Sequence, residues 1–445
     1  MWTPDSWRTL PIGQQPDWGD HTQLEIAEKE LANLPPLVYP SEIKELSAHL
    51  MKACKGRAFV LQAGDCAESF TDYSADSVKN KLKVILQMAV VLTYSSGVPV
   101  IKIGRIAGQF AKPRSAPFEN VAGKTLASFR GHIINGDGPT PLDRVPDPRR
   151  MIAAYHQSNA TINLIRALTK GGFSDLGKVH TWNQEFVATS DEGRRYESVA
   201  HEIERALRFM AACGIDLDQE ETLQQVKFWT SHEALLLSYE APLTRFDRSS
   251  NTYLDLSAHS LWIGDRTRDL KSAHMEFFSG IGNPIACKMG PSMTPSELIE
   301  ICEKLNPNRI PGRLTLVSRM GAENIHSKLP PLIKAVTQAG HPVIWSCDPM
   351  HGNTFVSENG FKTRNLEEII SEIAGFFRVH SSLGTWPGGL HVELTGEDVT
   401  ECLGGSYAIN EEDLDTAYNT ICDPRLNARQ SLDLAHRVAE LLIAM

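Results

Sequence analysis

Residues Val343-Ile344-Trp345-Ser346-Cys347-Asp348-Pro349-Met350-His351 show the pattern on which the fold prediction rests. A short apolar run, Val343–Ser346, ends abruptly in polar and charged side chains. Apolar runs of about 4 to 8 residues are typical of strands that are buried on both faces, as in parallel sheets. The sequence therefore predicts a buried parallel strand here, with Asp348 and His351 in the loop that follows it.

Seven further segments repeat this pattern along the chain. They are Ala58–Gln62, Val98–Ile103, Lys178–Trp182, Ser260–Ile263, Pro284–Cys287, Leu314–Val317 and Gly389–Val392. Eight buried strands that alternate with helices are the composition of a (β/α)8 barrel, and we predict this α/β fold, the TIM barrel. A doubly wound open sheet is the rival, because periodicity reveals neither the strand order nor closure of the sheet.

Helical periodicity fills most intervals between these strands. A capping box at Thr294-Pro295-Ser296-Glu297 predicts one helix start, and Asn365 with Glu368 predicts another. Apolar side chains at helical spacing predict a helix from Val78 that ends near Gly97, one that starts at Asp147-Pro148, and a last one over 427–445.

Two regions exceed what a plain barrel needs. Residues 1–55 precede the first predicted strand, and we expect this N-terminal extension to make oligomer contacts. A helical insert at about 183–258 separates the third predicted strand from the fourth and is a candidate regulatory element. Residues 56–445 would then form the catalytic barrel that carries this insert.

Charge and composition exclude several classes of partner. The net charge is -10, with 54 acidic against 44 basic residues, so a general attraction to nucleic acid or to an anionic membrane is not expected. The N-terminus lacks the apolar core of a secretory signal, and no stretch is long and apolar enough to span a bilayer. The eight cysteines are scattered without a C-x-x-C pair, which indicates reduced thiols and a cytoplasmic protein.

Basic residues gather where the predicted strands end. Because the functional groups of a parallel barrel lie at the carboxyl ends of its strands, these side chains would converge on one rim. Such a cationic cluster is stable only when anions neutralise it, and arginine and lysine are the side chains that bind phosphate and carboxylate groups. The set comprises Lys102, Arg105, Lys112, Arg114, Arg266, Arg268, Lys288, Arg319 and Lys362, with Ser115 and Asp265 beside them.

The same strand ends supply a candidate metal site. Cys66, His351 and Glu393 each follow a predicted strand and could meet at the rim. A thiolate, an imidazole and a carboxylate together suit Mn²⁺, Fe²⁺, Co²⁺ or Zn²⁺ better than Mg²⁺ or Ca²⁺. His391 lies two residues before Glu393, so on a regular strand it faces the same side and is a further ligand or an orienting partner.

At this point the motifs match a known family. The chain resembles the class II (plant-type) 3-deoxy-D-arabino-heptulosonate 7-phosphate (DAHP) synthases over nearly its whole length, in many long blocks in the right order. The blocks are 62–68 (QAGDCAE), 102–109 (KIGRIAGQ), 112–115 (KPRS), 264–268 (GDRTR), 288–291 (KMGP), 318–321 (SRMG), 348–353 (DPMHGN), 391–396 (HVELTG) and 422–427 (CDPRLN).

The resemblance implies a transferase on a (β/α)8 barrel that condenses phosphoenolpyruvate with erythrose 4-phosphate and water, the first step of the shikimate pathway to aromatic amino acids. It implies a divalent metal and favours Mn²⁺ or Co²⁺ over Zn²⁺ or Fe²⁺. The implied ligands are Cys66, His351, Glu393 and Asp423. His391 is then a supporting residue next to the ligands and is not itself a ligand. Asp423 lies beyond the last predicted strand, so the strand pattern alone does not nominate it.

Substrate contacts carry over in the same way. The resemblance implies that phosphoenolpyruvate is held by Arg105, Lys288 and Arg319, with Arg266 and Asp265 close by. It places the aldose phosphate against Arg114 and Ser115, with Lys112 and Lys362 completing the rim. Lys288, Arg105 and His351 are the implied catalytic residues. This sequence has Asp265 where the family pattern leads us to expect glutamate, which keeps the charge on a shorter side chain.

Two rival functions remain at this stage. One is a related phosphoenolpyruvate aldolase that uses another sugar phosphate, such as arabinose 5-phosphate. The other is a catalytically inactive regulatory or scaffold protein on the same fold, although the ligands and the cationic set are all present. The resemblance also implies a homo-dimer or homo-tetramer and inhibition by aromatic amino acids, and it does not say which amino acid acts.

Overall fold

The computed structural model describes residues 2–445 apart from 20, 122, 172, 175, 190–195, 215–225 and 406–407. Eight parallel strands close into a barrel in the order β1-β14-β11-β10-β9-β8-β5-β2. The closed order confirms the predicted barrel and excludes the open sheet. The strands are β1 (Phe59–Gly64), β2 (Val100–Arg105), β5 (Trp229–Glu233), β8 (Ser260–Ile263), β9 (Ile285–Met289), β10 (Leu314–Ser318), β11 (Ile344–Cys347) and β14 (Gly389–Glu393).

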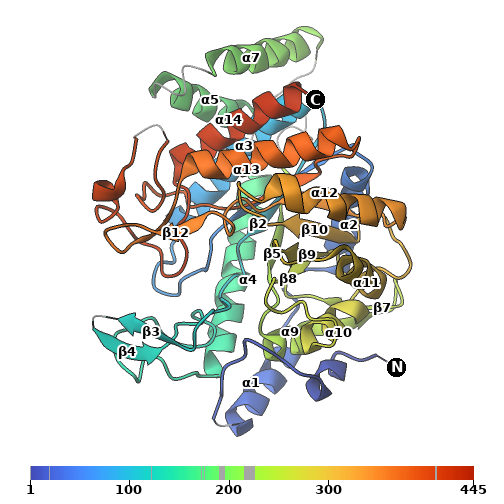
Figure 1. Ribbon diagram of the computed structural model, residues 1–445, viewed down its shortest axis with the longest axis vertical. Coiled ribbons are helices and arrows are strands. Elements are labelled where there is room, and N and C mark those ends of the chain that lie inside the picture. Colours follow the sequence, from blue (N-terminus) through green and yellow to red (C-terminus); the bar gives the residue numbers. More distant parts are fainter. Residues whose placement is uncertain are drawn as a thin grey trace.

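Helices cover the outside of the barrel, as Figure 1 shows. In the figure α12, α13 and α14 lie side by side over one flank, and α14 also packs on α3. The larger helices are α1 (His21–Asn33), α2 (Pro40–Cys54), α3 (Ala75–Ser96), α4 (Arg149–Lys170), α5 (Leu176–Thr189), α7 (Glu197–Ala212), α11 (Pro295–Leu305), α12 (Ile325–Gln338), α13 (Leu366–Ser382) and α14 (Ala428–Ile443). The short ones are α9 (Leu237–Leu243), α10 (Ala273–Gly280), η1 (Ser6–Thr9) and η2 (Glu411–Asp413).

The helix starts follow the predicted capping signals. Thr294 caps α11 by accepting the Glu297 N–H, Asn365 caps α13, and Asn427 forms a capping box with Gln430 at the start of α14. Helix α3 ends at Gly97, which adopts the left-handed conformation that glycine takes without strain. Local sequence therefore determines where the elements on either side of the rim loops begin and end.

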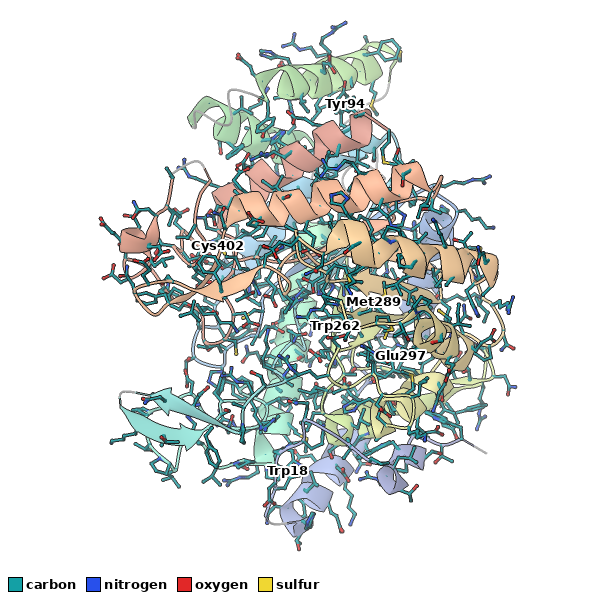
Figure 2. The ribbon with its side chains drawn as sticks, in the orientation of Figure 1. Trp18, Tyr94, Trp262, Met289, Glu297 and Cys402 are labelled. Atoms are coloured by element: carbon teal, nitrogen blue, oxygen red, sulfur yellow. The ribbon has the colours of Figure 1, made fainter. Side chains whose placement is uncertain are left out.

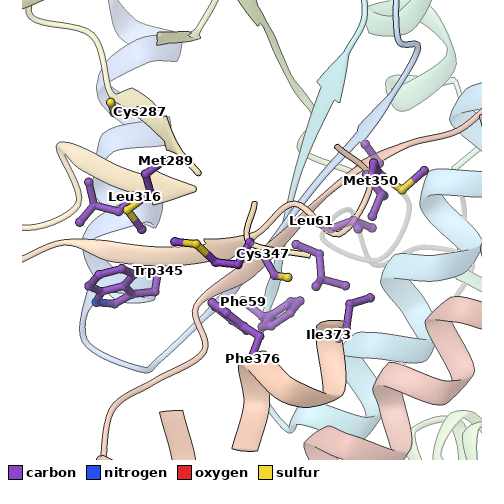
Figure 3. Packing of buried hydrophobic residues seen from close by; sticks show 14 of the residues in the cluster. Phe59, Leu61, Cys287, Met289, Leu316, Trp345, Cys347, Met350, Ile373 and Phe376 are labelled. Atoms are coloured by element: carbon purple, nitrogen blue, oxygen red, sulfur yellow. The ribbon is translucent and has the colours of Figure 1, made fainter. Parts of the chain in front are cut away.

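Side chains alternate between the two faces of each barrel strand. Outward residues form the main core: Figure 3 shows Phe59 and Leu61 of β1 and Cys347 of β11 packed toward Ile373 and Phe376 of α13. Inward residues at the amino-terminal ends, such as Val60 and Ile101, pack on Leu46 and Leu50 of α2. Helix α2 therefore closes the amino-terminal end of the barrel, and the carboxyl ends stay free for the site.

Loops at the carboxyl ends carry small accessory elements. A hairpin of β3 (Phe118–Val121) and β4 (Lys124–Ala127) follows β2, and a hairpin of β12 (Thr354–Val356) and β13 (Lys362–Arg364) follows β11. A third hairpin, β6 (Thr244–Asp247) with β7 (Thr252–Asp255), lies between β5 and β8. In Figure 1 the first two hairpins project on the same side of the molecule, which is the side of the rim.

One predicted strand is wrong. Lys178–Trp182 lies inside α5, and the third barrel strand is β5, Trp229–Glu233. Val179, Trp182 and Phe186 recur at helical spacing, which should have taken precedence over the shortness of the apolar run. The sequence did not predict β5 because its residues, Trp-Thr-Ser-His-Glu, are mostly polar, although all five are buried.

The position of the helical insert changes with that correction. The predicted insert at 183–258 contains β5 itself, so the extra helices α5 and α7 lie between the second and third strands instead of between the third and fourth. Parts of the predicted insert, 190–195 and 215–225, fall outside the described residues. Within the extension at 1–55, α1 packs on α4 and α9, and α2 packs on β1 and β11.

No helix within the described ranges combines the length and the apolar character that crossing a bilayer requires.

Candidate active site

Four segments bring the predicted metal ligands to the same rim. Cys66 follows β1, His351 follows β11, and Glu393 is the last residue of β14. Asp423 arrives by another route, because its segment runs beside the end of β14, where Leu426 N–H donates to Glu393 O at 3.1 Å and Thr395 N–H to Leu426 O at 2.9 Å. This added pairing explains how a residue beyond the last strand reaches the site.

Three of these side chains form a tight group. Ligand atoms of His351, Glu393 and Asp423 all lie within 4.8 Å of one another, and no other such group of His, Cys, Asp and Glu occurs among the residues described. His351 Nε2 lies 3.3 Å from Glu393 Oε1 and 3.9 Å from Asp423 Oδ2. Cys66 lies beside them and accepts the Asp423 N–H on Sγ at 3.3 Å. This donor set fits a divalent transition metal.

Cations of the chain surround the two carboxylates. Glu393 is fully buried and pairs with Arg105 Nη2 and with Arg364 Nη1, each at 2.8 Å. Lys112 reaches both Glu393, at 3.4 Å, and Asp423, and Lys362 also pairs with Asp423. Burial alone would raise the pKa of both carboxyl groups, but the neighbouring cations hold each pKa well below its usual range. Both groups are therefore anionic.

The surroundings of Cys66 favour its ionised form, the thiolate. Burial raises its pKa, but a hydrogen bond from Cys422 and the ammonium of Lys112 outweigh burial and lower the pKa to about 7. The thiolate is the form of cysteine that binds metals.

A cavity of about 160 Å³ opens beside the metal group. His351 and Asp423 line it, as do all the predicted substrate contacts except Arg105. Two of the predicted arginines lie on facing walls of this cavity. Arg114 comes from the loop after β2, and Arg319 comes from the loop after β10, on the opposite side of the barrel. The predicted residues that line it are Lys112, Arg114, Ser115, Asp265, Arg266, Lys288, Arg319 and Lys362.

Arg105 lies deeper, in the floor of the site. Its guanidinium carbon lies 5.1 Å from the ring centroid of Trp262, and Lys288 Nζ lies 5.7 Å from the same ring. Both distances fit cation–π contacts. Figure 2 shows Trp262 near the centre of the molecule, close to Met289 at the end of β9. Two predicted cations thus share one aromatic support at the base of the cavity.

His391 belongs to this floor and not to the metal group. Its Nε2 contacts Arg105 Nη1, and its Nδ1 lies 2.9 Å from Gln62 Oε1. Burial and the charges of Lys288 and Arg105 lower its pKa well below the usual range, so the ring is neutral and Nε2 can accept from Arg105. The structure thus places His391 as an orienting partner of Arg105.

Arg319 is oriented by a carboxylate across the cavity. Its Nη1 donates to Asp265 Oδ2 at 2.8 Å, and its Nη2 donates to the carbonyl oxygen of His351 at 3.1 Å. Asp265 also accepts from Arg268 Nε at 2.9 Å and from the Gly290 N–H at 3.0 Å. Arg268 is therefore a support for Asp265 and does not line the cavity.

Lys102 does not reach the rim, contrary to the prediction. It faces outward from β2, since it is paired in register with the outward Leu61, whereas Arg105 is three residues further and faces inward. Lys102 lines an apolar cavity with Leu86, Val179 and Ile203 under the outer helices, where burial lowers its pKa to about 8. Lys102 and Arg105 are three residues apart, and residues an odd number apart on a strand face opposite sides. The sequence alone could therefore have excluded Lys102 from the rim.

Sequence reasoning missed two residues of the site. Glu233 ends β5 and lines the cavity, where its buried Oε1 has no hydrogen-bond partner in the described structure. It was missed together with its strand. Arg364, the fully buried partner of Glu393, lies in β13, a hairpin strand outside the barrel, so strand-end reasoning could not find it.

The comparisons with known proteins identify the family of the chain. A family model described as the Class-II DAHP synthetase family matches residues 2–439. The chain belongs to this family. Among curated relatives, the phospho-2-dehydro-3-deoxyheptonate aldolase of Streptomyces coelicolor is 52% identical over 437 residues, which cover 98% of this chain and 96% of that protein. That of Mycolicibacterium smegmatis is 49% identical over 443 residues, covering 98% and 94%.

A solved structure of a phospho-2-dehydro-3-deoxyheptonate aldolase from Francisella tularensis shares 14% identity with a TM-score of 0.46, covering 98% of this chain and 100% of that one. The barrel assignment rests on the closed strand order and not on this likeness. Family membership and the two close relatives make the chain an enzyme of the DAHP synthase type.

Proposed function

We propose that the rim cavity condenses phosphoenolpyruvate with erythrose 4-phosphate and water to form DAHP and release phosphate, at the head of the shikimate pathway. The observation that carries this proposal is the direct contact between the metal group and the cationic cavity, since His351 and Asp423 belong to both. Two anionic substrates need cations for binding, and an aldehyde needs an electrophilic activator; the rim offers both within one cavity.

The proposed ligands of the metal are Cys66, His351, Glu393 and Asp423. Their mixed sulfur, nitrogen and oxygen donors support Mn²⁺ or Co²⁺, and Zn²⁺ or Fe²⁺ suit the same set. When bound, such an ion supplies Lewis-acid polarisation of the aldehyde oxygen of erythrose 4-phosphate. The chain's contribution is orientation, because Asp348 holds the far side of the His351 ring through Nδ1 and directs Nε2 toward Glu393 and Asp423.

The proposed phosphoenolpyruvate site is the deep end of the cavity, formed by Arg105, Lys288 and Arg319. Arg266 and Asp265 flank it. Lys288 and Arg319 each keep a carboxylate partner, Asp348 and Asp265, so both cations are fixed before the substrate arrives. Fixed donors stabilise developing charge without reorganisation. C3 of phosphoenolpyruvate would then attack the aldehyde carbon while water adds at C2.

The proposed aldose phosphate site is the outer wall, with Arg114 and Ser115, and with Lys112 and Lys362 nearer the metal group. Arg114 is half-exposed and pairs with Glu119, which also pairs with Arg144 at 2.6 Å. A guanidinium oriented in this way presents its fork to a phosphate at the mouth of the cavity. The separation of the two cationic ends gives each substrate its own place.

The proton of the attacking water has two candidate acceptors. Burial lowers the pKa of Lys288, and the neighbouring Arg105 lowers it further, although Asp348 opposes both. Glu233 lines the cavity and has a buried carboxylate oxygen without a hydrogen-bond partner among the described residues. We assign Lys288 with Arg105 and His351 as the catalytic residues, and we add Glu233 to the proton-transfer candidates.

The compartment and the assembly are proposals of the same kind. All eight cysteines are free in the structure, which supports a reducing compartment such as the cytoplasm. Exposed Ile26 on α1 and Phe118 on the β3–β4 hairpin support a homo-dimer or homo-tetramer through this end of the molecule. Size-exclusion chromatography with light scattering tests the assembly, and rates measured with Phe, Tyr and Trp, singly and together, test the aromatic effectors.

A steady-state assay tests the function directly. Purified protein with Mn²⁺, phosphoenolpyruvate and erythrose 4-phosphate should release phosphate and form DAHP, and arabinose 5-phosphate should support a much lower rate. A chelator should abolish the activity, and added Mn²⁺ or Co²⁺ should restore it. Turnover that survives full chelation would exclude the metal role, preference for arabinose 5-phosphate would favour the related aldolase, and no turnover with any metal would favour the inactive scaffold.

A further inference from the structure

A buried glutamate of the outer helical layer supports two rim loops from behind. Glu372 lies on α13, whose buried face is mostly apolar, with Ile369, Ile373 and Phe376 around Glu372 and with His380 as another buried polar side chain. Its side chain is fully buried, and burial together with the charge of Asp348, another carboxylate, raises its pKa to about 8. Burying a carboxylate that has no cationic partner costs free energy. Its presence therefore calls for a reason other than stability.

Both carboxylate oxygens of Glu372 accept hydrogen bonds, and the two donors belong to different loops. Oε1 accepts the backbone N–H of Met320 at 2.8 Å, in the loop after β10. Oε2 accepts Asn353 Nδ2 at 2.7 Å, in the loop after β11. Asn353 extends the connection, because its Oδ1 accepts the N–H of Ala322 at 3.0 Å. Glu372 and Asn353 thus tie one loop to the other.

The two loops also touch through their backbones. A Cβ placed on Gly352 would lie 2.4 Å from the nitrogen of Gly321, so neither side of this contact has room for a side chain. Gly321 adopts a φ of 83°, a conformation that glycine takes without strain. Arg319 Nη2 adds a bond to the carbonyl oxygen of His351 at 3.1 Å. The two loops are therefore joined by backbone as well as side-chain contacts.

We propose that Glu372 is a positioning residue that fixes the phosphoenolpyruvate cation Arg319 relative to the metal ligand His351. This inference rests on the proposed function, which assigns those roles. Met320 is covalently joined to Arg319, and Asn353 follows His351 by two residues, so one carboxylate sets the separation of a substrate contact and a metal ligand. Misplacement of reacting groups by about 1 Å can cost on the order of 100-fold in rate.

The chemistry of the contact requires a carboxylate and not an amide. Glutamine at 372 would turn a donor toward either the Met320 N–H or the Asn353 amide, and two donors cannot bond. A flip of Asn353 would not repair this, because its Nδ2 also donates to Pro349 O at 2.7 Å and its Oδ1 holds the Ala322 N–H. Glu372→Gln therefore changes no volume but breaks the tie.

The matched control lies on the same helix. Glu368 is one turn before Glu372 and is exposed, so Glu368→Gln makes the same chemical change away from the loops. We expect Glu372→Gln to raise the KM for phosphoenolpyruvate about tenfold and to weaken Mn²⁺ binding by a similar factor, the loss typical when one buried donor is left without a hydrogen-bond partner. At saturating Mn²⁺ the KM for erythrose 4-phosphate should stay within about twofold. Glu368→Gln should match the wild type throughout.

Binding of Mn²⁺ is measured without turnover, from the electron paramagnetic resonance signal of the free ion. Wild-type enzyme that forms no DAHP would reject the proposed function, whereas active wild-type enzyme with an unchanged Glu372→Gln variant would reject this inference alone. A uniform loss in all constants, together with a lowered melting temperature, would show a structural role only and would also reject it.

Asn353→Ala keeps the test decisive if Glu372→Gln does not fold. Asn353 is half-buried in a loop, so its truncation should spare the fold and raise the KM for phosphoenolpyruvate in the same selective way. The double variant should be no worse than the more impaired single variant, because both changes break one connection. Effects that multiply, or an Asn353→Ala variant that matches the wild type, would overturn the proposal.

Discussion

His351 Nδ1 lies 2.8 Å from Oδ2 of Asp348, and the same carboxylate oxygen accepts Lys288 Nζ at 2.7 Å. Burial would raise the pKa of Asp348, but His351 and Lys288 hold it well below the usual range, so the group is anionic. One fully buried carboxylate therefore connects a proposed metal ligand with a proposed catalytic lysine. The sequence contains this link as a spacing of three residues, Asp348-Pro349-Met350-His351.

Asp348→Asn is expected to weaken Mn²⁺ binding about 10- to 100-fold, the usual loss when the partner behind a ligating histidine is removed. The amide is neutral, and its single oxygen cannot replace both carboxylate oxygens, because Oδ2 faces His351 and Lys288 whereas Oδ1 accepts the Met350 N–H at 3.1 Å. The free-ion signal of Mn²⁺ measures the affinity. The exposed Asp415, changed to asparagine, is the control, and equal affinities in the two variants would contradict the link.

Cys66→Ser is expected to weaken metal binding and to lose most of the rate, because an alcohol is a poorer ligand than a thiolate whose pKa lies at about 7. Cys213→Ser is the matched control, since that thiol is exposed on the surface at the end of α7. Metal content after dialysis and the initial rate at limiting Mn²⁺ check the prediction. A Cys66→Ser enzyme with wild-type activity at low metal would remove Cys66 from the ligand set.

Glu233→Gln is expected to lower kcat by about 100-fold, within the range that general acid–base catalysis contributes, with little change in either KM. The reason is that Glu233 lines the cavity, and its buried Oε1, beside Gly264, has no hydrogen-bond partner among the described residues. Steady-state kinetics at saturating metal measure both constants. If KM rises while kcat stays unchanged, Glu233 binds substrate and does not transfer the proton.

Glu42→Gln is expected to lower the free energy of unfolding by about 1 kcal/mol at pH 7, the value of a helix-capping contact. Glu42 accepts the Tyr39 N–H at 2.8 Å and pairs with Arg166 at 2.7 Å. Burial would raise the pKa of Glu42, but the neighbouring His259, the hydrogen bond from the Tyr39 N–H and the pairing with Arg166 lower it from 4.5 to about 2.

Since that pKa is depressed in the folded state, the stabilisation is fully present above about 4.5 and is lost as the pH falls toward about 2. Urea unfolding of wild type and Glu42→Gln at several pH values measures the difference. A difference that stays constant down to pH 3 would contradict the assignment of the shift to this carboxylate.

The fold was predictable where strands are apolar and helices are capped. Seven of the eight strands have the short apolar runs of buried parallel strands, as β11 does in Ile344–Cys347. The strand β5 does not, because its buried polar side chains have partners far away in the sequence: Ser231 accepts from Gln62 of β1, and Thr230 bonds His259, just before β8. Local patterns cannot anticipate such long-range partners.

Only part of the candidate site could likewise be predicted from the sequence. Side chains that directly follow a strand, such as His351 and Arg319, were found from position alone. Asp423 required the family resemblance, because a pairing between Leu394 and Leu426 brings it back to the rim. Arg364 and Glu372 were not found at all. Arg364 contacts Glu393 from a hairpin strand outside the barrel, and Glu372 contacts the rim loops from the outer helix α13, so the role of each is visible only when its partners are known.

The arginine and lysine partners of Glu393 and Asp423 have a practical consequence for how this enzyme is handled. Because the chain's own cations balance these carboxylates, we expect the folded state to persist without an ion, in contrast to small zinc domains. We therefore expect the ion to exchange in the native protein. Preparations from different growth media would carry different metals in the same folded protein, and reconstitution in the native state, without refolding, would make them uniform.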